Sequence, residues 1–233
     1  MSKLKRSESG AIMIEGALST LFWVPLLLGV LYFGSALVTA LQVVQVDRDA
    51  GHMFARGVYF GTDTAGYANE TLLARLGQQL GLASVDGSGN VTGVSTTGPM
   101  VIILTKIQNV SANACVAYNG VVGGCANVGD WVVTQRLNIG NSTLRQSNYT
   151  PSGVPSADLD PTSGVVVNGT NGNYTYPLYL QDSSLRLTGF NLITISATGF
   201  PTDTPAYLAE AFLQTPVVPG FPGSGGLYMM TIF

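Results

Sequence analysis

The chain has 233 residues and a formal net charge of −3, and 46 % of its residues are hydrophobic while only 10 % are charged. Soluble domains carry roughly 25 % charged residues, so the composition argues against an ordinary cytoplasmic globular protein. Apart from the cations at the N-terminus, Lys and Arg are scattered between Arg48 and Arg186 without forming a basic patch, which argues against nucleic-acid binding. Twenty-nine Gly and eleven Pro predict many turns and a β-rich body.

The N-terminal segment is predicted to form a membrane-spanning helix. Lys3, Lys5 and Arg6 precede a stretch, residues 16–46, that contains no charged residue. Residues 17–41 alone would form about 37 Å of helix at about 1.5 Å per residue, enough to cross a hydrocarbon core of about 30 Å with some tilt. The positive-inside rule then places the N-terminus in the cytoplasm and residues 47–233 on the far side of the membrane.

A cleaved signal peptide is the main alternative for this segment, because residues 38–40 (Val-Thr-Ala) offer a cleavage site before Leu41. The apolar run is about twice as long as the 7–15 residues usual in such peptides. It also continues beyond Ala40 in helical register, with apolar or small residues on one face at Val43, Val46, Ala50, Met53, Phe54 and Gly57. We therefore expect one helix that extends to about Phe60.

From residue 61 onward the pattern changes to that of a β-rich domain. Residues 69–80 predict a short amphipathic helix with buried Leu72, Leu73, Leu76 and Leu80, capped by Gly81. Residues 100–108 and 131–139 have strand patterns, and further strand candidates are residues 164–167, 176–180, 184–187, 192–197, 206–214 and 227–233. No helical pattern lies between these candidates, so we expect a mainly antiparallel sheet and, with the N-terminal helix, an α+β fold.

Cys115 and Cys125 are the only cysteines and stand ten residues apart. Outside the cytoplasm such a pair predicts a disulfide, which for a loop of this size stabilises by roughly 2–3 kcal/mol in the chain-entropy model. Two free buried thiols are the alternative. A metal site would need two more ligands, and the single histidine, His52, is far away in the sequence, so we expect no metal and no cofactor.

Catalytic chemistry finds little support in the sequence. A Ser/His/Asp or Cys/His arrangement would have to use His52, which stands between Arg48 and Arg56 on the polar face of the predicted helix. A secreted hydrolase is thus disfavoured, and we predict that the protein is not an enzyme.

The most distinctive local pattern is residues 9–18, Ser-Gly-Ala-Ile-Met-Ile-Glu-Gly-Ala-Leu. It places Gly10 at the end of the basic leader and Glu15 five residues later, inside the apolar segment. A charged group within a membrane helix costs at least about 2.5–3.5 kcal/mol and usually has a function. Glu15 is therefore expected to require a partner.

This pattern resembles the processing site of type IV prepilins, where a membrane peptidase cuts after the Gly. The resemblance implies that Gly10 is the last leader residue, that Ala11 is the first mature residue, and that Glu15 pairs with the N-terminal amine of a neighbouring subunit. Together with residues 25–28 (Pro-Leu-Leu-Leu), 33–34 (Phe-Gly) and 48–57 (Arg-Asp-Ala-Gly-His-Met-Phe-Ala-Arg-Gly), the region around residues 9–60 resembles the TadE/TadG pseudopilins of the tight-adherence (Flp, type IVb) pilus system.

The resemblance implies three parts: a leader at residues 1–10, a transmembrane and stem helix at 11–60, and an extracytoplasmic β-rich head at 61–233. It implies a single-pass protein of the bacterial inner membrane, N-in and C-out, with its head in the periplasm or in an extracellular pilus. Its expected partners are the inner membrane, a prepilin peptidase, other pilin subunits and the pilus assembly platform, in a structural role. The alternative is a stand-alone membrane-tethered binding module or adhesin, which would tolerate replacement of Glu15.

Overall fold

The computed structural model describes residues 5–119, 125–149, 158–171, 174–187, 204–215 and 225–233. The chain divides into two compact units, Met1–Leu41 and Gln42–Phe233. The predicted strand at residues 192–197 lies outside the described residues. Within the described part, the α+β class and the antiparallel sheet are confirmed.

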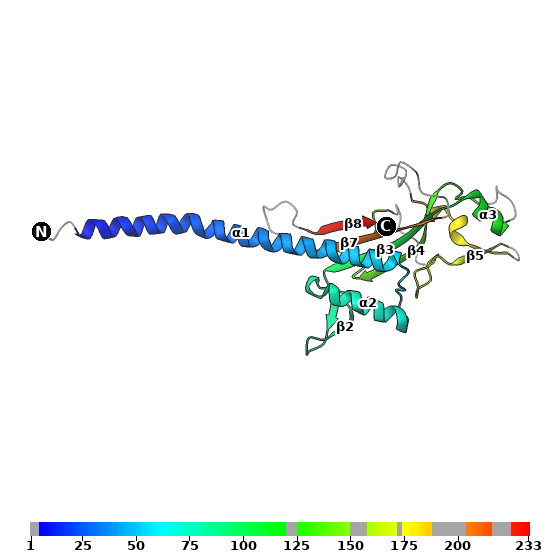
Figure 1. Cartoon of the computed structure of the whole chain (residues 1–233), viewed down its shortest axis with the longest axis horizontal. Helices are drawn as coiled ribbons and strands as arrows, with labels where there is room; N and C mark the ends of the chain where they lie inside the picture. The colour runs from blue at the N-terminus through cyan, green and yellow to red at the C-terminus, as the bar shows by residue number, and fades with distance from the viewer. Residues whose placement is uncertain (1–4, 120–124, 150–157, 172–173, 188–203, 216–224) are drawn as a thin grey trace. The chain divides into compact units, whose positions relative to one another are not determined.

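Helix α1 (Lys5–Ala55) contains 51 residues and has parts in both units (Figure 1). Pro25 lies within this helix. It ends at Ala55, five residues before the expected end at Phe60. The reason is Gly57, which adopts a left-handed conformation with φ of 78° and accompanies a backbone bond from Val58 N to Met53 O of 3.0 Å. A left-handed residue just past the last turn is a common helix terminator.

The second unit is built on a four-stranded antiparallel sheet of β3 (Met100–Asn109), β4 (Trp131–Gly140), β7 (Pro205–Leu213) and β8 (Leu227–Ile232). The strand order is β4-β3-β7-β8, so the two outer strands are β4 and β8 (Figure 1). Four of the predicted strands are therefore confirmed, with ends that differ by no more than one residue.

One face of this sheet packs against the part of α1 that belongs to the second unit. The helix contributes Val43, Val46, Ala50 and Phe54, all buried, at spacings of three and four residues. The sheet contributes alternate residues of its strands, namely Met100, Ile102, Leu104, Leu137, Ile139, Ala209, Ala211 and Leu213. The amphipathic pattern predicted beyond Ala40 therefore forms the main core of this unit.

Helix α2 (Thr64–Leu76) and the short 3₁₀ helix η1 (Gln78–Leu80) replace the single helix expected at residues 69–80. The Asp63 side chain caps α2 by accepting from Gly66 N at 2.8 Å, which starts the helix earlier than the apolar pattern indicated. Leu73 and Leu80 are buried as predicted, but Leu72 and Leu76 are about half exposed, so that part of the prediction is wrong. Gly81 caps η1, at a φ of 76°.

Smaller elements complete the second unit. A hairpin of β1 (Ala83–Val85) and β2 (Val91–Val94), helix α3 (Ala112–Asn119) and strand β5 (Asn168–Asn171) were not predicted. The candidate at residues 176–180 divides into β6 (Tyr174–Pro177) and a 3₁₀ turn, η4 (Leu178–Leu180). The candidate at 184–187 overlaps another such turn, η5 (Ser183–Leu185), and the one at 164–167 makes isolated bridges rather than a strand.

Candidate functional site

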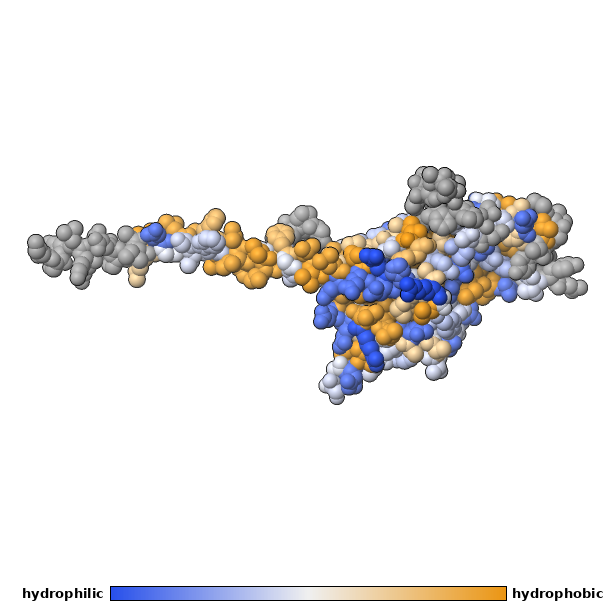
Figure 2. All heavy atoms as spheres, in the orientation of Figure 1, coloured by the Kyte–Doolittle hydropathy of each residue, from blue (hydrophilic) through white to orange (hydrophobic). Residues whose placement is uncertain are grey.

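The first unit presents apolar side chains that have no covering element among its described residues. Side chains are described from Met13 onward, so Gly10 and Ala11 are placed only as positions within α1. Between residues 13 and 41 the large apolar side chains are exposed, by 64 % for Ile14, 66 % for Phe22 and 68 % for Leu31. Apolar residues cover much of this part of the helix in Figure 2. Among the residues that the structure describes, one helical span, Met13–Ala55, is long and apolar enough to cross a membrane.

Three hydroxyl groups of this helix segment are bonded to the helix backbone. Thr20 Oγ1 donates to Gly16 O at 3.1 Å, Ser35 Oγ to Tyr32 O at 2.8 Å, and Thr39 Oγ1 to Ser35 O at 3.0 Å. Polar groups satisfied inside the helix lose little when water is removed, whereas an unsatisfied group in hydrocarbon costs several kcal/mol. These residues are therefore compatible with lipid surroundings.

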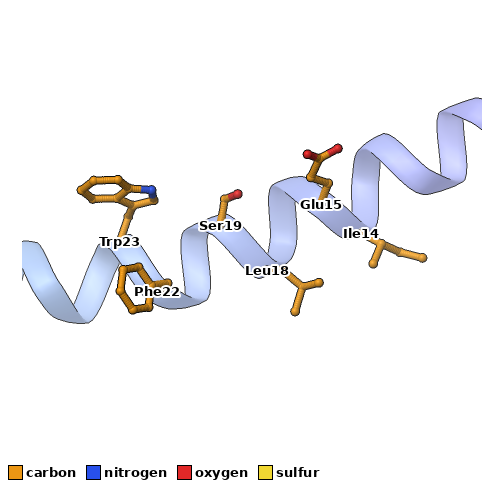
Figure 3. A pocket seen from close by; sticks show the side chains of 6 residues that line it. All are labelled: Ile14, Glu15, Leu18, Ser19, Phe22 and Trp23. Atoms are coloured by element: carbon orange, nitrogen blue, oxygen red, sulfur yellow. The ribbon is translucent and has the colours of Figure 1, made fainter.

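Glu15 differs from these hydroxyl residues. Its side chain is exposed and makes no hydrogen bond or ion pair with the residues that the structure describes. Figure 3 shows Glu15, Ser19 and Trp23 projecting from one side of α1 and Ile14, Leu18 and Phe22 from the other, each row at a spacing of four residues. One side of the helix thus carries a carboxylate, a hydroxyl and an indole, and the other side carries three apolar side chains. All six side chains line a shallow hollow on the helix surface.

In the second unit, α1 carries a second unusual carboxylate, Asp47. Its side chain is completely buried, and its Oδ2 accepts a hydrogen bond of 2.7 Å from Thr231 Oγ1 of β8. Within the described residues, Oδ1 has no partner. Burial raises the pKa of Asp47 to about 7, with a smaller contribution from the charge of Glu210, while the bond from Thr231 acts in the opposite direction.

The opposite face of the sheet holds a buried polar cluster around Glu210, which sequence reasoning missed. Glu210 is 1 % exposed and accepts hydrogen bonds from Ser147 Oγ, from Asn148 N at 3.1 Å and from Tyr228 Oη at 2.6 Å. Desolvation, followed by the bond to Glu210, raises the pKa of Tyr228. These bonds attach residues 147–148 to β7 and β8, so the cluster organises the loop that follows β4.

Arg136 of β4 completes this cluster. Its Nε donates to Thr105 Oγ1 at 3.1 Å and its Nη2 to Ser147 Oγ at 3.3 Å. Burial lowers the pKa of Arg136 to about 10, while the charge of Glu210 partly opposes that shift. The signal in the sequence was one charged residue within each of two apolar strand patterns, because such residues are rarely buried without partners. The arrangement is that of a structural network.

A groove of about 390 Å³ lies beside α2 and β4, and its lining includes the Glu70 carboxyl, Thr96, Asn138 and Thr162. Within the described residues, Glu70 makes no hydrogen bond or ion pair, and burial raises its pKa to about 7. Asp160 at the same groove differs, because Ser163 and Thr162 donate hydrogen bonds to it and lower its pKa. The groove therefore offers two carboxyl groups held in different environments.

The cysteines form the predicted disulfide, with a Cα–Cα distance of 5.9 Å. Cys115 belongs to α3 and is buried, and Cys125 packs with Val110, Val132 and Leu180 in a small cluster beside the main core. The alternative of two free buried thiols is wrong, since both sulfurs are in the bond. The bridge ties α3 to the segment that leads into β4.

His52 is exposed on α1, and its ring lies 4.6 Å from that of Phe233, between centroids. The described residues contain no group of three or more His, Cys, Asp or Glu side chains that could hold a metal ion. The structure thus brings together one of the candidate pairs from the sequence, the two cysteines, while Glu15 stands separately on the exposed helix. Comparisons with family models, with characterised proteins and with solved structures find no match to this chain.

Proposed function

We propose that the chain is a membrane-anchored pseudopilin, a structural subunit for assembly of a tight-adherence (type IVb) pilus. In this proposal the exposed part of α1 lies in the inner membrane with its N-terminus in the cytoplasm. The second unit is the extracytoplasmic head, and the protein has no catalytic role. The prepilin peptidase removes residues 1–10, and other pilin subunits and the assembly platform are the partners.

The observation that carries the proposal is Glu15. It is the only charged residue between Gly10 and Val46, it is exposed, and no described residue pairs with it. A carboxylate in lipid requires a counter-charge, and a helix that lacks one must obtain it from another chain. A simple anchor would gain stability in the membrane from an uncharged residue at this position. Retaining the acid is therefore best explained by pairing between subunits, which also fixes their axial register.

The disulfide and the packed half of α1 support the same proposal. A disulfide persists in an oxidising compartment, in agreement with a head outside the cytoplasm. The part of α1 that belongs to the second unit contributes Val43, Val46, Ala50 and Phe54 to the core of the head, in agreement with a stem helix that ends inside the head.

The test compares Glu15→Leu, Glu15→Asp and Leu18→Ala for co-purification with pilus components after detergent extraction, at matched expression. Glu15→Leu should insert in the membrane, because removal of the carboxylate lowers its transfer cost by about 2.5–3.5 kcal/mol, but it should fail to co-assemble. Leu18→Ala removes an apolar neighbour and should assemble. Equal recovery of all variants would support the stand-alone membrane-tethered module instead.

A Gly10→Leu variant tests the processing step independently. The leader should remain attached to the inserted protein, because the peptidase acts after a Gly at this position. Processing equal to that of the unchanged chain would refute the assignment of Gly10 and Ala11 as the cleavage site.

A further inference from the structure

Three polar side chains of the first unit make no hydrogen bond with the residues that the structure describes. They are Glu15, Ser19 and Trp23, and all three are exposed, Trp23 by 57 %. The three hydroxyl groups described above differ, because each donates to a carbonyl group of its own helix. An unsatisfied polar group is costly in hydrocarbon, so these three side chains require partners outside their own helix.

The same three side chains form one row on α1. Figure 3 shows them projecting from the same side of the helix, four residues apart. Each step of four residues advances about 6 Å along the helix axis. The Glu15 carboxylate only accepts hydrogen bonds, the Ser19 hydroxyl donates and accepts, and the Trp23 indole N–H only donates. Along the chain, the row therefore runs from an acceptor through a mixed group to a donor.

Such a row is complementary to a second copy of itself displaced by one step. Ser19 of one copy then lies level with Glu15 of the other, and Trp23 of the first lies level with Ser19 of the second, so both pairs combine a donor with an acceptor. Without displacement, two carboxylates would face each other, and so would two indole donors. A displacement of two steps would pair only Glu15 with Trp23 and leave both Ser19 hydroxyls unmatched.

The direction of the two helices decides between the remaining arrangements. Antiparallel copies could also match Glu15 with Trp23. Copies that insert through the same basic N-terminal segment have one direction in the membrane, so they pack parallel. In parallel copies the displacement by one step also sets Ala11 of one copy level with Glu15 of the other, because Ala11 precedes Glu15 by four residues. The amine pairing in the proposed function requires this same displacement.

We propose that the row Glu15, Ser19 and Trp23 is the contact face for the membrane helix of a second copy of this chain, displaced by four residues or about 6 Å along the axis. Ser19 of one copy donates to Glu15 of the other, and Trp23 Nε1 of the first donates to Ser19 Oγ of the second. The contact is heterologous, because the two copies use different members of the row. It rests on the membrane anchoring in the proposed function, which gives both copies one direction.

Disulfide cross-linking of full-length chains in the membrane tests the displacement. By the helical period, Leu26 and Val30 continue the face that carries the row, while Leu28 lies on the opposite side. A chain with Leu26→Cys and a differently tagged chain with Val30→Cys are expressed together and oxidised. They should cross-link to each other, and each variant expressed alone should give no cross-linked dimer. Leu28→Cys is the control and should cross-link with neither, while the native cysteines are already paired with each other.

A matched pair of substitutions tests the hydrogen bonds in the same assay. Ser19→Ala removes a hydroxyl of the row and should lower the yield of the cross-link between positions 26 and 30 by about threefold, the effect of one hydrogen bond between membrane helices. Trp23→Phe, which keeps a ring but removes the N–H, should have a similar effect. Thr20→Val removes a neighbouring hydroxyl that donates to Gly16 O, and the yield should not change.

Three results would overturn the proposal. They are cross-linking of each cysteine variant only with its own kind, absence of any cross-link, and equal yields for Ser19→Ala and Thr20→Val. Absence of a cross-link would mean that the row faces a different protein. If Glu15→Leu abolished co-assembly with pilus components and no cross-link formed, only this contact would be contradicted. A cross-link between positions 26 and 30 in a chain that co-assembles equally well with Glu15→Leu would contradict only the pseudopilin role.

Discussion

The two halves of α1 are one continuous helix with two different surfaces. Residues 13–41 expose apolar side chains on every side and carry one charged group, Glu15. Residues 42–55 are amphipathic, with buried Val43, Val46, Ala50 and Phe54 on the sheet. A helix that is apolar all round needs apolar surroundings on every side, whereas an amphipathic helix needs one apolar neighbour. The described sheet of the second unit supplies that neighbour for residues 42–55, and residues 13–41 have no covering element among the described residues of their own unit.

The largest expected effect comes from replacing one phenylalanine by alanine in each half of α1. Phe54 is 4 % exposed and meets the Tyr207 ring edge to face, with centroids 5.4 Å apart. Phe54→Ala should lower the free energy of unfolding of the head by about 3–5 kcal/mol, because it leaves a cavity in the core. Phe33 is 64 % exposed, and Phe33→Ala should change it by less than about 0.5 kcal/mol. Denaturant unfolding in mild detergent measures both, and equal losses would contradict the division of the helix.

A change outside α1 sharpens the comparison. Replacing both Cys115 and Cys125 by Ser should lower the stability of the head by about 2–3 kcal/mol, since the bridge limits the unfolded chain. Membrane association should not change, because it depends on residues 13–41. Thermal melting of the oxidised protein and of the double variant checks the first statement, and membrane fractionation checks the second. A double variant with an unchanged melting temperature would mean that the bridge is not structural.

Two glycines give a smaller, matched contrast. A Cβ on Gly51 would collide with the ring of Phe233, whereas a Cβ on Gly29 would have no atom within 4 Å. Gly51→Ala should therefore destabilise the head by about 1–3 kcal/mol, the usual cost of overpacking. Gly29→Ala should be neutral or slightly stabilising, because Ala favours the helix. Unfolding curves recorded side by side test the pair, and a neutral Gly51→Ala would show that the Phe233 ring moves aside at little cost.

A pH-dependent effect concerns Asp47, which lies outside the proposed membrane span of residues 17–41. Burial raises its pKa to about 7, against about 3.9 in an unfolded chain. The folded state binds this proton more tightly, so the free energy of unfolding should fall as the pH rises from about 4 to 7. Asp47→Asn should remove that slope and stabilise the head above pH 7 by up to about 4 kcal/mol, the free energy that corresponds to the difference between the two pKa values. Asp49→Asn, on the less buried side of α1, is the control and should keep the slope.

Much of the fold could be predicted from local patterns. Three patterns predicted a helix or a strand correctly, because each depends on a single surface of one element. They are the long apolar segment, the β-branched run of residues 100–108 and the alternation at residues 131–139. The start of α2 was misjudged because Asp63 sets it through a cap, while the first turns of α2 face solvent and carry no apolar period. Leu72 and Leu76 fit the helical period yet remain exposed, since the period does not show how wide the buried face is.

The polar contacts were harder to predict than the strands that carry them. Arg136 and Glu210 lie 74 positions apart, and only the strand order β4-β3-β7 brings them to the same face of the sheet. The pairing of Asp47 with Thr231 joins the stem helix to the C-terminal strand and depends on the same long-range packing. The disulfide was predictable because its two cysteines are close in sequence and have no competitor.

The mature N-terminus of the protein recovered from cell membranes tests the account most directly. Mass spectrometry of the N-terminal peptide should find Ala11, which would leave residues 13–41 attached to the head as an anchor with Glu15 at the fifth position. An N-terminus at Leu41 would contradict the account, because the whole apolar half of α1 would then be a removed signal peptide. An N-terminus at Met1 or Ser2 would leave an uncut anchor and contradict the prepilin-type processing.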